Sequence, residues 1–165
     1  MRRASSIIAL IGLVTVGACG GDGGNDNPTG PNNENQTVTG DGNVRATING
    51  AAWRSLKSGD RVTRNGNFYG IATVNLPYAL VLGVANVTGP GTFNLNLSAG
   101  NGSSAIISNS TGGWGTAFNG GSGTITVTTL TATRIVGTFS FDAVPGSGSA
   151  TGTVVVRNGT FDLTF

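Results

Sequence analysis

Asn-Gly dipeptides recur along this chain and constrain its fold more than any other feature of the sequence. There are five of them, at 49–50, 65–66, 101–102, 119–120 and 158–159. A two-residue type I′ hairpin turn needs positive φ at both central residues, and Asn and Gly reach that conformation at low cost. The dipeptides therefore indicate antiparallel strands joined by tight turns.

The segments between these turns have the residue types of β-strands. The predicted strands beside the first, second and last dipeptides are, in order, 44–48, 51–56, 61–64, 68–74, 154–157 and 160–165. The others are 78–87, 91–97, 105–108, 114–118, 123–130 and 134–144. The run 78–87 is apolar on both faces, so we expect a central strand that is covered on both sides.

Alternation within these runs indicates the fold class. In the last run Phe161, Leu163 and Phe165 share one face, opposite Asp162 and Thr164. A period of two with one apolar face is typical of a half-buried antiparallel sheet. Turn signals about every ten residues favour a sandwich or a small closed barrel of about ten to twelve short strands. The expected fold is therefore all-β, with no significant helix after the N-terminal segment.

The N-terminus has the pattern of an export signal. Arg2 and Arg3 precede an apolar run over 4–16, and Val16-Gly17-Ala18-Cys19 ends it. A basic start, a short apolar core and small residues before a cleavage position describe a signal peptide, here 1–18. The run is shorter than the roughly 20 apolar residues of a transmembrane helix. An ordinary secreted protein with an unused cysteine, or a membrane anchor, is the alternative.

The segment Val16-Gly17-Ala18-Cys19 resembles the lipobox of bacterial lipoproteins. This resemblance implies a diacylglycerol on the Cys19 sulfur, cleavage before Cys19 and acylation of the new amine. Cys19 is the only cysteine of the chain and stands where the motif requires one. Two or three acyl chains anchor a protein stably. Because Gly20 and Gly21 are not the retention signal Asp, the resemblance also implies the outer membrane.

The expected tether is residues 19–42, and the expected single β domain is 43–165. Residues 20–42 contain one aliphatic side chain, Val38, among Gly, Asn and four acidic residues, so they are expected to be disordered. Without residues 1–18 the chain has seven basic and seven acidic side chains. Its pI of about 9.2 therefore reflects the signal peptide and does not indicate nucleic-acid binding.

Composition excludes several kinds of catalytic and metal site. The chain has no His, which excludes Ser-His-Asp and Cys-His catalysis, and its single Cys excludes a disulfide framework and a structural zinc site. No metal and no cofactor is expected. The remaining catalytic alternative is an envelope hydrolase that uses Asp142 and Asp162, which become neighbours if their strands pair. Glycosidases need two carboxyls about 5–9.5 Å apart.

Two features are candidates for ligand contact. The first is a set of five basic residues with one acidic residue among them: Arg45, Arg54, Lys57, Arg61 and Arg64. They form either a patch for anionic glycans or lipopolysaccharide phosphates, or an ordinary solvated face.

The second candidate is Trp114, which stands among Gly112, Gly113 and Gly115. That setting is typical of an exposed loop, where an indole can stack on a sugar ring. Trp53, which lies beside Ala51 and Ala52, is expected in the core.

The domain contains four strand-and-turn motifs: Ala46-Thr-Ile-Asn-Gly-Ala-Ala-Trp53, Gly123-Thr-Ile-Thr-Val127, Val136-Gly-Thr-Phe-Ser-Phe-Asp-Ala143 and Val156-Arg-Asn-Gly-Thr-Phe161. With them, most of 46–165 resembles an uncharacterised bacterial lipoprotein domain family. The resemblance implies a fold and no particular chemistry. The ending Phe161-x-Leu163-x-Phe165 also resembles the closing strand of outer-membrane barrels, but the short strands and the 7% aromatic content argue against a barrel.

The sequence thus predicts a lipid-anchored cell-envelope protein that is not an enzyme. Its expected role is surface binding or envelope structure. The expected partners are the membrane, through the N-terminal lipid, and a glycan or another envelope component.

Overall fold

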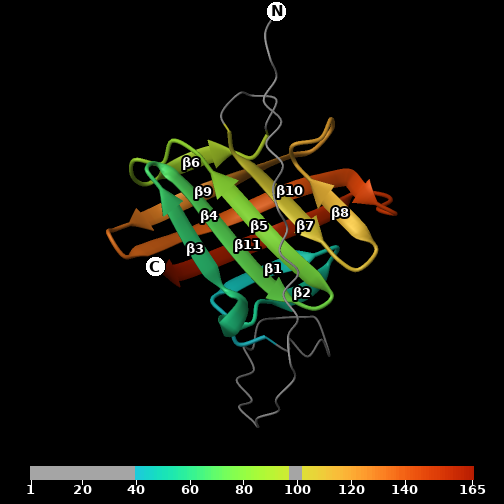
Figure 1. Cartoon of the computed structure of the whole chain (residues 1–165), viewed down its shortest axis with the longest axis horizontal. Helices are drawn as coiled ribbons and strands as arrows, with labels where there is room; N and C mark the ends of the chain where they lie inside the picture. The colour runs from blue at the N-terminus through green and yellow to red at the C-terminus, as the bar shows by residue number, and fades with distance from the viewer. Residues whose placement is uncertain (1–39, 97–101) are drawn as a thin grey trace, which may run out of the picture. The chain divides into compact units, whose positions relative to one another are not determined.

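A computed structural model describes residues 40–96 and 102–165 of the chain. The predicted signal peptide, Cys19 and most of the predicted tether lie outside these residues. One element in the described part is a single 3-10 turn, η1 (Lys57–Gly59), and all the others are strands (Figure 1). The strands are β1 (Val44–Ile48), β2 (Ala51–Arg54), β3 (Arg61–Asn65), β4 (Phe68–Asn75), β5 (Tyr78–Val84), β6 (Gly91–Asn94), β7 (Ser104–Ser108), β8 (Gly112–Gly115), β9 (Ser122–Leu130), β10 (Arg134–Gly148) and β11 (Val154–Thr164).

All strand pairs are antiparallel, and they follow the order β2-β1-β11-β10-β8-β7-β5-β4-β3, with β9 on β10 and β6 on β9. The fifteen-residue strand β10 is shared. Its first part pairs with β9 and β11, and residues 144–148 pair with β8. We call β2-β1-β11-β10-β9-β6 layer A and β8-β7-β5-β4-β3, with the end of β10, layer B. In Figure 1 the strands of layer B cross in front of layer A. The sheet does not close, so the all-β sandwich prediction is confirmed and the closed-barrel alternative is wrong.

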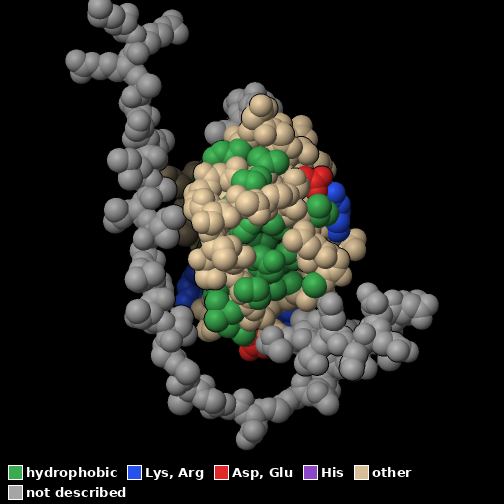
Figure 2. All heavy atoms as spheres, turned by 90° about the vertical axis from the view of Figure 1, so that its right-hand side faces the viewer, with side chains coloured by type: hydrophobic (Ala, Val, Ile, Leu, Met, Phe, Trp, Pro, Cys, Tyr) green, Lys and Arg blue, Asp and Glu red, His purple; other side chains and the backbone are tan. Residues whose placement is uncertain are grey.

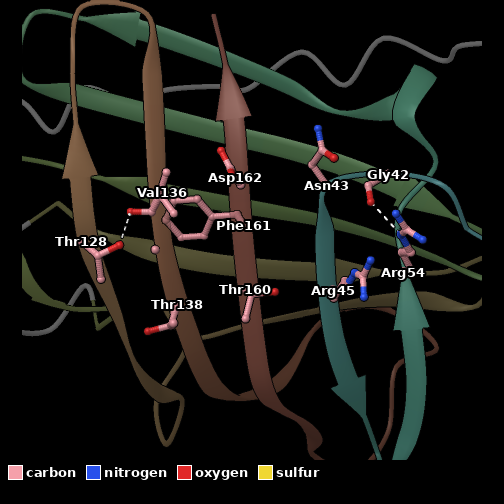
Figure 3. Close-up of a pocket in the computed structure, with 11 residues that line it drawn as sticks. Gly42, Asn43, Arg45, Arg54, Thr128, Val136, Thr138, Thr160, Phe161 and Asp162 are labelled. Carbon is pink, nitrogen blue, oxygen red and sulfur yellow. Dashed lines mark hydrogen bonds between the residues drawn. The ribbon is translucent and has the colours of Figure 1, made fainter. Parts of the chain in front are cut away.

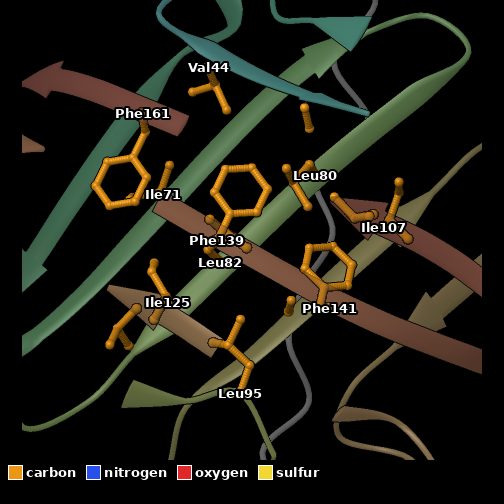
Figure 4. Packing of buried hydrophobic residues seen from close by; sticks show 14 of the residues in the cluster. Val44, Ile71, Leu80, Leu82, Leu95, Ile107, Ile125, Phe139, Phe141 and Phe161 are labelled. Atoms are coloured by element: carbon orange, nitrogen blue, oxygen red, sulfur yellow. The ribbon is translucent and has the colours of Figure 1, made fainter. Parts of the chain in front are cut away.

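One apolar core lies between the two layers. In layer A the rings of Phe139 and Phe141 stack with centroids 6.2 Å apart, and Phe161 lies 6.4 Å from Phe139. Figure 4 shows these rings among Leu80 and Leu82 of β5. In a view from the side, apolar side chains form a band down the middle of the molecule, with charged side chains at its margins (Figure 2). Large aromatic and aliphatic side chains therefore fill the interior that the glycine-rich strands enclose.

Two of the predicted hairpins form, and the first has its Asn-Gly dipeptide as the turn. Asn49 and Gly50 have φ of 49° and 84° and join β1 to β2, as a type I′ turn requires. Between β3 and β4 the turn residues are Gly66 and Asn67, because Asn65 still pairs with Phe68. The third dipeptide lies partly outside the described residues, and the fourth is in the connection from β8 to β9.

The fifth dipeptide is a β-bulge, so the prediction of a hairpin between 154–157 and 160–165 is wrong. The strand β11 continues through Asn158 and Gly159, and its pairing with β10 shifts there, from Phe139 opposite Gly159 to Phe141 opposite Val156. Asn158 has a φ of 53°. A Cβ on Gly159 would lie 2.5 Å from the Phe139 ring. A bulge and a tight turn thus need the same residues, and the tertiary setting decides between them.

The predicted central strand is also corrected in one respect. The strand β5 lies between β4 and β7, as expected for a central strand. It is covered on one face only, because Leu80 and Leu82 are buried whereas Val81 is 43% exposed.

The first described residues belong to the folded part, although composition assigned residues 40–42 to the tether. The Gly42 amide donates to the Ser55 carbonyl at 2.7 Å, and the Lys57 amide donates to Asp41 Oδ1 at 2.9 Å. The ordered chain therefore begins before the expected boundary at residue 43.

Candidate functional site

The outer face of layer A holds a pocket of about 400 Å³ (Figure 3). Small-molecule sites have volumes of roughly 300–1,000 Å³, so the pocket is large enough for one sugar-sized group. It is lined by Gly42, Asn43, Arg45, Arg54, Thr128, Val136, Gly137, Thr138, Thr160, Phe161 and Asp162.

Strand alternation brings the polar lining together. On β11 Phe161 is buried in the core, so its neighbours Thr160 and Asp162 stand on the outer face. The register of β10 and β11 places Thr138 opposite Thr160 and Val136 opposite Asp162. Residues distant in the sequence thus form one row of outward side chains across β9, β10, β11 and β1 (Figure 3).

Two arginines stand at one end of this row. Arg45 and Arg54 are directly opposite each other across β1 and β2. Arg54 donates from Nε to the Gly42 carbonyl at 2.8 Å and from Nη2 to the Asp41 carbonyl at 3.3 Å. The guanidinium of Arg45 has no hydrogen bond or ion pair to the part of the chain that the structure describes. Like charges opposite each other in a sheet are unfavourable, so an anion beside Arg45 would relieve their repulsion.

On β11, the strand next to β1, Asp162 is held by Arg134. Arg134 donates from Nε to Asp162 Oδ1 at 2.8 Å and from Nη2 to Oδ2 at 2.6 Å. These hydrogen bonds, with the charge of the guanidinium, lower the pKa of the Asp162 carboxyl and raise the pKa of Arg134. Because Arg134 neutralises this carboxylate, Arg45 and Arg54 determine the charge of the pocket, which is positive.

Hydroxyl groups line the rest of the floor, on β9, β10 and β11 (Figure 3). Thr128 donates from Oγ1 to the Val136 carbonyl at 3.2 Å. The hydroxyls of Thr138 and Thr160 have no hydrogen-bond partner among the described residues. A hydroxyl is both a donor and an acceptor. The pocket can therefore pair an anionic group with the arginines and polar groups of the same ligand with the threonines.

A family model describing a domain of unknown function, DUF6252, matches residues 40–162. The chain belongs to the DUF6252 family. No curated protein and no solved structure matches the chain. The DUF6252 match contains every residue that lines the pocket.

In the folded DUF6252 domain, the residues of the predicted basic patch lie in two separate places. Arg54 lines the pocket, whereas Lys57, Arg61 and Arg64 do not. Lys57 is on η1, and Arg61 and Arg64 are on β3 in layer B. Arg64 lies over the Tyr69 ring, 5.6 Å from its centroid. The patch divides because η1 carries the chain from layer A to layer B between Arg54 and Arg61.

Trp114 is buried in the DUF6252 domain, so the prediction of an exposed stacking platform is wrong. It is 6% exposed, and Trp53, which was predicted in the core, is 7% exposed. Trp114 stands opposite Ile107 on the inner face of layer B. The flanking glycines, which indicated a loop, belong to strand β8 instead.

The two candidate catalytic carboxylates do not form a pair. Asp162 is opposite Val136, and Asp142 is opposite Val155, six positions further along β10. At about 3.3 Å per residue the separation is roughly 20 Å, beyond the spacing of glycosidase carboxyls. The Asp142 carboxylate contacts Arg157, with Nη2 at 2.7 Å from Oδ1 but off the direction of a hydrogen bond. The hydrolase alternative thus loses the residues on which it depended.

Within residues 40–96 and 102–165 there is no cluster of three or more acidic, His or Cys side chains that could hold a metal ion. The same residues contain no helix that is long and apolar enough to cross a membrane. Sequence reasoning missed most of the DUF6252 pocket, because the motifs that contain Thr138 and Thr160 indicate strands and turns and give no sign of ligand contact. Only strand register brings them to Arg45.

Proposed function

We propose that this chain is a lipid-anchored protein of the cell envelope, at the outer membrane, whose DUF6252 domain is a binding module and not an enzyme. The motif Val16-Gly17-Ala18-Cys19 supports the anchor. One observation carries the binding role: the guanidinium of Arg45 has no partner among the described residues and stands beside Arg54 in a pocket with open hydroxyls.

The chemistry of the pocket favours an anionic glycan. A guanidinium makes paired hydrogen bonds to carboxylate, sulfate or phosphate groups. Thr138 and Thr160 are placed to exchange hydrogen bonds with sugar hydroxyls. No exposed aromatic ring lines the pocket, so recognition would rest on charge and hydrogen bonds and not on stacking.

The test uses residues 20–165, which have neither the signal peptide nor the lipid. Among the residues that the structure describes, every buried core residue lies between Val44 and Leu163, so residues 20–165 contain all of them. On an array of neutral, uronic-acid and sulfated glycans, we expect retention of anionic members only. Arg45→Gln should weaken binding about ten- to a hundredfold, the worth of a charge-assisted hydrogen bond.

The matched control is Arg64→Gln, which removes the same charge from β3 of layer B. This variant should bind the anionic glycans with the same affinity as the wild type. If the Arg45 variant binds with the same affinity as the wild type, the pocket is not the glycan-binding site. If neutral glycans are retained as well as anionic ones, the pocket does not select for charge.

A further inference from the structure

The outer face of layer B carries large exposed hydrophobic side chains. Phe68, Val81, Ile106 and Phe118 are 40%, 43%, 46% and 43% exposed. We call these four residues the apolar face. Contiguous exposed apolar surface on a soluble domain marks an interaction site more often than chance.

The four residues are continuous across the layer. Val81 is opposite Ile106 in the pairing of β5 and β7. The Phe68 ring lies over Gly83, where an added Cβ would be 3.2 Å from it, and the Phe118 ring lies over Gly115, where the corresponding distance is 2.9 Å. The two rings lie over glycines, which have no side chains. The rings can therefore lie flat against the sheet and form a smooth surface.

Charge is distributed unevenly over the domain. From residue 65 to residue 133 the sequence has no Asp, Glu, Lys, Arg or His, and this segment contains β4, β5, β7 and β8. The only charged residues in the strands of layer B are Arg61 and Arg64, on its edge strand β3. Arg61 is opposite Ala72, which is opposite Val81, so Arg61 lies in the same row of outer side chains as Val81. Arg64 is opposite the buried Tyr69 and points to the other face of β3. The apolar face is thus uncharged and has Arg61 at its edge, which complements an anionic lipid surface.

The described chain begins beside that same edge. Asp41 Oδ1 accepts from the Lys57 amide, and the Asn43 amide donates to Asp60 Oδ2 at 2.8 Å. These contacts hold residues 41–43 against η1 and the start of β3. A tether that comes from Cys19 would therefore join the domain next to Arg61.

We propose that the apolar face lies on the surface of the membrane in which the lipid is anchored, with Arg61 against anionic head groups. The proposal rests on the lipid anchor proposed above, because the tether raises the local concentration of membrane so that a weak contact suffices. Layer A is the opposite side of the sandwich, so this contact turns the pocket of Arg45 away from the membrane.

The first measurement is co-sedimentation of residues 20–165 with a large excess of vesicles of phosphatidylethanolamine and phosphatidylglycerol, so that a weak contact is detected without the tether. The wild type should bind these vesicles, and it should bind phosphatidylcholine vesicles less. Val81→Asp should lower the affinity at least about tenfold, which corresponds to the burial of one valine side chain. The matched control Thr124→Asp adds the same charge to the outer face of layer A and should bind like the wild type.

Two further variants test the proposal even if Val81→Asp prevents folding. Phe118→Ser changes a residue outside the strands and should also weaken binding. Phe68→Trp places a fluorophore on the apolar face, and its emission should shift to the blue with vesicles and be quenched by brominated acyl chains. Trp53 and Trp114 are buried, so their emission should change little.

Three results would overturn the proposal. They are absence of vesicle binding by the wild type, equal loss in Val81→Asp and Thr124→Asp, and a dimer of the wild type that Val81→Asp dissociates, since a second copy would then cover this face. The chain used has no lipid, so none of these results bears on the anchor at Cys19. Glycan binding by Arg45 is measured without membranes and can fail or succeed separately.

Discussion

Trp114 is hydrogen-bonded to Gly152, whose carbonyl oxygen accepts from the indole Nε1 at 3.0 Å. The neighbouring carbonyl of Thr151 accepts from the same nitrogen at 3.2 Å. The indole therefore joins β8 to the loop between β10 and β11, in addition to filling part of the core.

We expect Trp114→Ala to lower the free energy of unfolding by about 3–5 kcal/mol, the range for a buried large aromatic side chain. Trp53→Ala should lower it by a similar amount, since both side chains are buried. Trp114→Phe retains most of the apolar volume and should cost about 1 kcal/mol for the lost hydrogen bond. Urea denaturation measures all three. A loss below about 1 kcal/mol for Trp114→Ala would be typical of a surface residue and would contradict this assignment.

Gly159→Ala should destabilise the domain by about 1–3 kcal/mol, because the added methyl group overlaps the Phe139 ring. The matched control is Gly89→Ala, where no atom lies within 4 Å of the new Cβ. That variant should differ from the wild type by less than about 0.5 kcal/mol. Thermal and urea melts of both proteins decide the point. Equal stability of the two variants would mean that Phe139 moves aside freely.

The ion pair of Arg134 and Asp162 should make stability depend on acid pH. The pKa of Asp162 is lower in the folded protein than its ordinary value of 3.8. Its contribution is therefore complete above the unfolded pKa and is lost as the pH falls through the folded pKa. The stability difference between wild type and Asp162→Asn should be constant near neutral pH and should shrink below about pH 4.

Denaturation midpoints of the two proteins over this pH range test the pair. Both side chains are about half exposed, so added salt should reduce the difference near neutral pH. A difference that grows on acidification would contradict the assigned direction.

Cys19→Ala should abolish acylation, because the chain has no other cysteine that could carry the diacylglycerol. Cells that express the wild type in the presence of labelled palmitate should yield a labelled protein, and cells that express the variant should not. Normal labelling of the variant would exclude the lipobox interpretation.

The strands were predictable because their signal is local. Alternation and β-branched residues suffice to place β1, β4 or β9, whatever lies beside them. The connections were less predictable, since Asn158 takes in a bulge the same positive φ that Asn49 takes in a turn. The choice depends on Phe139, which lies on another strand.

The candidate site was less predictable than the fold for the same reason. Its residues span from Gly42 to Asp162 and meet only through the registers of β1, β10 and β11. Trp114 was misplaced because glycine neighbours usually indicate a loop. In the folded domain, Gly113 and Gly115 pair with β7 and β10 in an ordered strand.

The strand β10 has a mechanical consequence for the whole domain. Its backbone passes from layer A into layer B between Ala143 and Val144, with hydrogen bonds to neighbours on both sides of that point. The layers therefore cannot rotate about each other as two halves joined by a hinge, because rotation would bend a strand that is paired in both. The domain should move as a rigid body, so the angle at which one face meets its surroundings also sets the direction in which the opposite face points.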